Sequence, residues 1–240
     1  MKWFIFLLIL FLISPILYSS PSKISSLPLP LDYVRVPYAD TSFSGYVQKL
    51  SLKSENKVYS YKREDLSHWY ESLGVIDKPL LYTDDLEQCA DFTMRLWADF
   101  HKENNLLSEL YLFQYSGKKA FYKSSGKTFP QFLRNAFANS NSHSIKMGGR
   151  EVKVTELRPG DLFVQNENGG IGHVSIILDH VKSEGREDLF LIGFSFMPAQ
   201  EMHIEKAPDN RGKSGWFSYR GFIAHLAEKY PYGKPVLRRF

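Results

Sequence analysis

Cysteine is almost absent from this sequence of 240 residues, in which Cys89 is the only one. No disulfide can form within the chain, so a small fold held together by disulfides is excluded. Neither charge dominates, because 30 basic residues face 26 acidic ones, which is too small an excess to indicate nucleic-acid binding. No internal repeat is present, and only one long apolar run occurs. The composition, 43% hydrophobic and 15% aromatic, suits a single globular domain with a packed core.

The one long apolar run lies at the N-terminus, where residues 3–13 follow a short basic start. This order, with Pro15 and small residues near Ser20, is typical of a secretory signal peptide over residues 1–20. A retained anchor is the alternative, since residues 16–18 could extend the run towards the ~20 residues that span a bilayer. We expect cleavage, no stable membrane span afterwards, and an extracytoplasmic location, either periplasmic or secreted.

The pattern after the leader predicts one domain preceded by a short lead-in. Residues 21–43 are rich in Ser and Pro and predict an extended segment, and residues 44–240 form the domain. Alternation over residues 46–52 and 58–61 predicts a β-hairpin. Residues 65–73 predict a short helix.

Two longer helices are expected in the middle of the chain and strands in the second half. Residues 85–104 start with acidic capping candidates and place Cys89, Phe92, Leu96 and Phe100 on one face. A further helix is expected near residues 130–138. Strands are expected near residues 151–154, 162–165, 173–179 and 189–195. Helices followed by an antiparallel meander predict an α+β fold.

Cys89 and His173 are the leading candidates for chemistry. A thiol becomes a nucleophile when a helix N-terminus or a nearby imidazole favours its ionised form. Cys89 lies near the start of a predicted helix, and His173 opens a strand after the glycine-rich residues 169–172, from which it can face that helix. The plainer interpretation is structural, because a free cysteine on an apolar helix face is usually buried core.

Two segments resemble cell-wall cysteine peptidases of the NlpC and CHAP types. Residues 157–164, Leu-Arg-Pro-Gly-Asp-Leu-Phe-Val, and residues 172–178, Gly-His-Val-Ser-Ile-Ile-Leu, follow the order of strand motifs in those families. The resemblance spans residues 82–195. It implies a papain-like fold, with a helix that carries Cys packed on an antiparallel sheet. It also implies that Cys89 is the nucleophile and His173 the base.

The mature chain is also similar to an exported bacterial family catalogued as a domain of unknown function (DUF4846-like). Gln88-Cys89-Ala90-Asp91, Gly160-Asp161, Gly172-His173 and the run over residues 195–204 carry this similarity. That family implies no activity.

The remaining site residues depart from the peptidase pattern, which usually has Asp-Cys-Ser-Gly at the nucleophile. Gln200 is the favoured third member of a triad, because an amide oxygen can accept from the imidazole and fix its tautomer; Ser195 and His203 compete for that place. Gln88 is an oxyanion candidate, together with the Cys89 backbone N–H.

Other polar residues have alternative or plainer roles. Asp91 either lines the cleft or forms an i,i+4 ion pair with Arg95. Asp161 is expected to cap the turn after Gly160. No spacing of His173, Asp179, His180 and His203 matches a zinc motif, so we expect neither a metal nor a cofactor.

These observations predict an exported thiol hydrolase that cleaves an amide bond through a Cys89 acyl-enzyme. Peptide stems of peptidoglycan are the expected substrate, and a thiol acyltransferase would use the same residues. The alternative is a non-catalytic module that binds cell-wall or surface glycopeptide, which the aromatic residues Trp216, Phe217 and Tyr219 favour. No nucleic-acid partner is expected, and the oligomeric state stays open.

Overall fold

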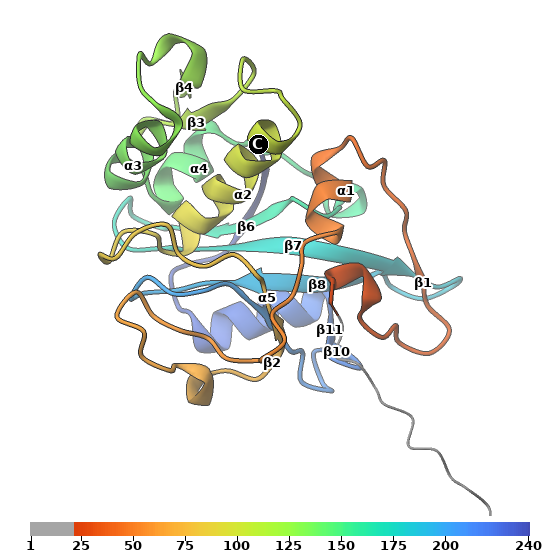
Figure 1. Ribbon diagram of the computed structural model, residues 1–240. Coiled ribbons are helices and arrows are strands. Elements are labelled where there is room, and N and C mark those ends of the chain that lie inside the picture. The colour runs from red at the N-terminus through yellow and green to blue at the C-terminus, as the bar shows by residue number, and fades with distance from the viewer. Residues whose placement is uncertain (1–21) are drawn as a thin grey trace, which may run out of the picture.

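The computed structural model describes residues 22–240, so the predicted signal peptide at residues 1–20 lies outside the described residues. A large antiparallel sheet forms the centre, with helices on both faces (Figure 1). The α-helices are α1 (Phe43–Gln48), α2 (Cys89–Glu103), α3 (Phe129–Asn139), α4 (Ser142–Gly148) and α5 (Tyr219–Lys229). In the described part of the chain, none of these helices is long and apolar enough to cross a membrane.

The main sheet has ten strands, and seven of them follow the order β10-β11-β8-β7-β6-β12-β5. Their bounds are β5 (Arg150–Glu151), β6 (Leu162–Gln165), β7 (His173–Lys182), β8 (Leu189–Phe194), β10 (Gly212–Lys213), β11 (Trp216–Ser218) and β12 (Val236–Arg239). Three further strands attach to this row, namely β1 (Val34–Arg35), β2 (Ser72–Val75) and β9 (His203–Glu205). A separate hairpin joins β3 (Tyr111–Phe113) to β4 (Lys119–Phe121).

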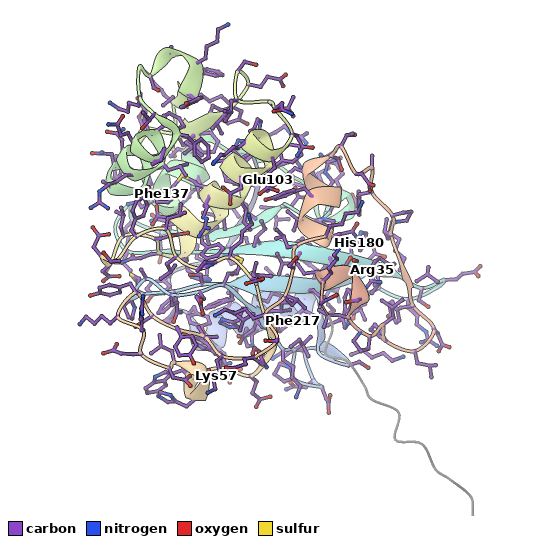
Figure 2. The ribbon with its side chains drawn as sticks, in the orientation of Figure 1. Arg35, Lys57, Glu103, Phe137, His180 and Phe217 are labelled. Carbon is purple, nitrogen blue, oxygen red and sulfur yellow. The ribbon has the colours of Figure 1, made fainter. Side chains whose placement is uncertain are left out.

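The sheet separates two apolar cores. Successive residues of a strand point to opposite faces, so on β7 Val174 and Ile176 pack beneath α2 and Ile177 packs towards α5. Figure 2 shows this division, with Phe137 among the helices above the sheet and Phe217 below it. The predicted mixed α+β architecture with an antiparallel sheet is confirmed.

Helix α2 carries the predicted apolar face and begins at Cys89, later than residue 85. The chain reaches it through tight turns, in which Leu86 N–H donates to the Asp84 carbonyl oxygen at 2.8 Å. The Asp91 carboxylate then accepts from the Gln88 backbone N–H at 3.1 Å and satisfies one group before the helix starts. Cys89 therefore occupies the first helical position.

Two predictions in the first third of the chain are wrong. Residues 46–52 were expected to start a hairpin, whereas Phe43–Gln48 form α1, capped by Ser42 Oγ, which accepts from Gly45 N–H at 3.1 Å. Residues 65–73 were expected to form a helix, whereas only Ser67–Trp69 make a 3₁₀ turn and Ser72–Val75 form β2, which pairs with β9. Tertiary pairing outweighs the local pattern here.

The segment expected as an extended lead-in packs into the core. Ile24 is fully buried and Tyr33 is 8% exposed, and both belong to the cluster of side chains beneath α2. Strand β1 pairs with β7, with Val34 opposite Lys182. The apolar residues spaced among the prolines make this segment part of the domain.

Candidate functional site

A cleft of about 460 Å³ opens at the start of α2. The cleft has three walls. The first turn of α2 forms one, the end of α3 and the start of α4 form the second, and the glycine-rich loop before β7 forms the third. The lining residues are Asp85, Leu86, Gln88, Cys89, Ala90, Asp91, Phe137, Ala138, Ser140, Asn141, Ser142, Gly170, Ile171, Gly172 and Met197. Because the first N–H groups of a helix have no partners within it, this end of α2 offers hydrogen-bond donors to a ligand.

The thiol of Cys89 lines the cleft but is protected by its surroundings. The residue is only 5% exposed, and this burial raises the pKa of the Cys89 thiol to about 12. Nearby Asp91 raises the pKa further, whereas the Val174 backbone N–H next to the sulfur lowers it. Burial outweighs the helix N-terminus, so the thiol is protonated at neutral pH.

Asp91 is the second buried group in the cleft and is 6% exposed. Burial is the main cause that holds the pKa of the Asp91 carboxyl well above its usual range, and the nearby Glu87 carboxylate adds to it. The Oδ1 atom has no hydrogen-bond partner among the described residues. The predicted ion pair with Arg95 is not formed, because Arg95 pairs with Glu87 at 2.7 Å and Asp99 at 3.5 Å.

His173 lies on the other face of the sheet. Its ring contacts the rings of Phe194, at a centroid distance of 4.3 Å, and Tyr230, at 5.4 Å. The Nε2 atom shares a 2.9 Å hydrogen bond with Ser175 Oγ, two residues along the same strand. Burial lowers the pKa of His173 to about 3, so the imidazole is neutral.

The expectation that His173 faces the Cys89 helix is therefore wrong. His173 pairs with Gln165 across β6 and β7, and both side chains point to the α5 face. The neighbouring residue Val174 takes the α2 face. No hydrogen bond joins the Cys89 sulfur to the imidazole, whose Nδ1 atom is buried without a partner among the described residues.

The other residues predicted for a triad bond elsewhere. The Gln200 side-chain amide donates to Tyr70 OH at 2.7 Å, and the Ser195 hydroxyl donates to the Gln200 backbone carbonyl oxygen at 2.9 Å. Neither is hydrogen-bonded to His173. The Gln88 side chain lines the cleft, but its amide donates to the Asp85 carboxylate at 3.1 Å and to the Asp85 backbone carbonyl oxygen at 3.4 Å, so neither N–H is free to serve an oxyanion.

Two further predictions are resolved by the contacts. Asp161 caps its turn as expected, because its Oδ2 accepts from the Arg158 backbone N–H at 2.9 Å. Trp216 and Phe217 are 1% and 0% exposed. These aromatic rings belong to the two cores, so they cannot contact a ligand at the surface.

A buried charge cluster on the α5 face was not anticipated from the sequence. Glu205 accepts from His203 and His225, each at 2.9 Å, and from Lys229 at 3.2 Å. Bonds to its two histidines and the positive charge of Lys229 hold the pKa of Glu205 below its usual range despite burial. The alternation of His203 and Glu205 on one strand was the available signal. Among residues 22–240, no group of three or more His, Cys, Asp or Glu residues is arranged to hold a metal ion.

The fold and the cleft define a mixed α+β domain with a buried thiol at the N-terminus of α2, its longest helix. The chain belongs to the family described as Domain of unknown function (4846), whose model matches residues 24–124 and 113–239. This result confirms that part of the predicted resemblance. Neither the curated proteins nor the solved structures give a significant match.

Proposed function

We propose that this protein is an exported module that binds peptide or glycopeptide of the cell wall in the cleft at the start of α2. The observation that carries the proposal is an open cleft of about 460 Å³ whose thiol has no hydrogen bond to the His173 imidazole, which is bonded to Ser175 instead. Apolar residues such as Leu86, Phe137 and Met197 line it together with the polar Asn141 and Ser142, a composition that suits both the side chains and the amide groups of an extended peptide. We also propose that the fold is papain-like, because a helix that begins at Cys89 packs on an antiparallel sheet.

Binding is tested by co-sedimentation with purified peptidoglycan and by calorimetry with soluble muropeptides. Ala138 is exposed on α3 and lines the cleft, so Ala138→Trp fills the cleft without disturbing the core. We expect this variant to weaken binding by at least about tenfold. The matched control is Asn135→Trp, because Asn135 is exposed on the same helix outside the cleft lining. Equal binding by the two variants would exclude the cleft as the site.

Thiol hydrolysis of an amide is the second candidate function. Cys89 is the first residue of α2 and lines the cleft, which is the placement that a cysteine nucleophile takes. This activity requires a base to reach the sulfur, and His173 would have to leave the α5 face. Mass spectrometry of muropeptides incubated with the protein and with Cys89→Ser decides between the two functions. Fragments that appear with the unaltered protein but not with Cys89→Ser would support hydrolysis.

A further inference from the structure

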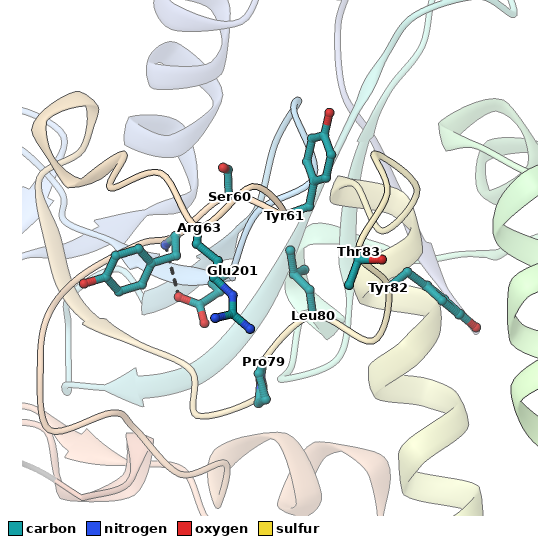
Figure 3. A pocket seen from close by; sticks show the side chains of 9 residues that line it. Ser60, Tyr61, Arg63, Pro79, Leu80, Tyr82, Thr83 and Glu201 are labelled. Atoms are coloured by element: carbon teal, nitrogen blue, oxygen red, sulfur yellow. Dashed lines mark hydrogen bonds between the residues drawn. The ribbon is translucent and has the colours of Figure 1, made fainter.

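A second pocket of about 360 Å³ lies between the turn at residues 59–63 and the segment at residues 79–83. Figure 3 shows Arg63 and Glu201 beside each other, with Leu80 and Thr83 across from them. Pro79 and Tyr61 add apolar surface to its walls. The pocket thus combines an apolar interior with one exposed cationic side chain.

The negative charge in this pocket is already neutralised. Both carboxylate oxygens of Glu201 accept from Lys53 Nζ, at 2.7 and 2.8 Å, and one also accepts from the Tyr59 backbone N–H at 3.1 Å. Arg63, in contrast, forms no salt bridge with any residue in the described range 22–240. Its positive charge is therefore available to a ligand.

The backbone holds Arg63 in an unfavourable conformation. Its φ angle is +64°, in the left-handed region that side-chain-bearing residues rarely adopt. The turn is fixed by the bond from Arg63 N–H to the Ser60 carbonyl oxygen at 2.8 Å and by Ser60 Oγ, which accepts from Lys62 N–H at 3.2 Å. Strain of this kind is retained where the surrounding structure imposes it, and it clusters at ligand-binding sites. Glycine would occupy the position more easily.

We propose that this pocket binds a carboxylate carried on an apolar body, with the Arg63 guanidinium as the anion-binding group. The planar guanidinium can donate two parallel hydrogen bonds to a carboxylate. Leu80 and Pro79 receive the aliphatic part of the ligand, since their side chains form the apolar wall. The pocket differs from the α2 cleft, whose lining includes Asp85 and Asp91 and no basic residue.

The pocket adds a subsite to the proposed function and rests on it only for the identity of the natural ligand. Leu80 and Thr83 line the pocket, and the same segment continues to Asp85 and Gln88 of the cleft. Stem peptides carry free carboxylates on short aliphatic residues. A peptide held in the cleft would therefore present the chemistry that this pocket selects.

The test uses pentanoate and its neutral analogue pentanamide as probes, with NMR titration of the mature protein. We expect pentanoate to shift the Arg63 side-chain signals and to bind about 10- to 100-fold more tightly than pentanamide. Arg63→Gly should abolish this preference while it retains or raises thermal stability, because glycine suits the positive φ. Arg63→Lys should keep a reduced preference for pentanoate, since the positive charge remains but the two parallel N–H donors of the guanidinium are lost.

The control is Arg220→Gln, which removes an exposed arginine that does not line this pocket and should bind pentanoate normally. Equal binding of the two probes, or an unchanged preference in Arg63→Gly, would overturn the inference. Stem-peptide binding that depends on the Ala138 wall but not on Arg63 would contradict the pocket and leave the cleft proposal intact. Pentanoate binding that depends on Arg63, without any peptide binding, would support the pocket and contradict the cleft proposal.

Discussion

Alkylation of Cys89 gives the most direct measure of the candidate site. The pKa of about 12 for the buried thiol contrasts with about 8.5 for an unfolded cysteine. At pH 8 the ionised fraction is then about 10⁻⁴ in the folded protein and about 0.2 in the unfolded chain. Since the thiolate is the reacting form, we expect iodoacetamide to label the native protein about 10³-fold more slowly than the unfolded protein.

Intact mass measures this reaction without ambiguity, because the chain holds one cysteine. Rapid labelling in denaturant serves as the positive control. Asp91→Asn should accelerate native labelling, since Asp91 contributes to the raised pKa of Cys89. Labelling of the native protein at pH 6 to 8 at the unfolded rate or faster would refute the reasoning. It would mean that the thiol is activated, and the hydrolase would become the better proposal.

Three predictions concern stability. The pKa of His173 is about 3 in the folded protein and ~6.5 in the unfolded chain, so the unfolded state binds the proton first as the pH falls. Urea unfolding should therefore show a loss of up to about 5 kcal/mol in the free energy of unfolding between pH 6.5 and 3. His173→Gln should make this free energy less dependent on pH. Glu205→Gln removes the anion bonded to two histidines and a lysine, and should cost about 3–5 kcal/mol in the free energy of unfolding. A cost below 1 kcal/mol would show that the cluster is not held by that charge. Gly160→Ala should cost about 1–3 kcal/mol in the free energy of unfolding, because φ is +93° and the added Cβ would lie 2.7 Å from Phe43. Thermal unfolding measures this cost, and an unchanged melting temperature would contradict it.

The elements that the sequence predicts well are those with a strong local pattern. Helix α3 at Phe129–Asn139 and the strands β6 and β8 match the expected positions, since a capped amphipathic helix and continuous apolar runs are local signals. Helix α1 has only six residues, too few to be stable alone. It depends on packing between Phe43 and the α2 side chain Trp97, with ring centroids 5.1 Å apart, which no local pattern could reveal.

The sequence predicts where the candidate residues lie along the chain, but not the face of the sheet on which the His173 side chain lies. Cys89 lies at the start of its helix as expected, and His173 opens its strand. Which face His173 takes depends on strand register, and a shift of one residue reverses every side chain. The pairing of His173 with Gln165 sets that register. The sequence motif gives the order of these residues but not their register.

Strand β12 connects two parts of the sheet that are otherwise unjoined. It pairs with β6 on one side and β5 on the other, with Val236 opposite Val164 and Arg238 opposite Glu151. A chain interrupted before residue 236 would leave the edge of β6 open and β5 detached. Open apolar edges recruit other chains and start aggregation. A chain truncated before residue 236 should therefore aggregate more readily than the full chain.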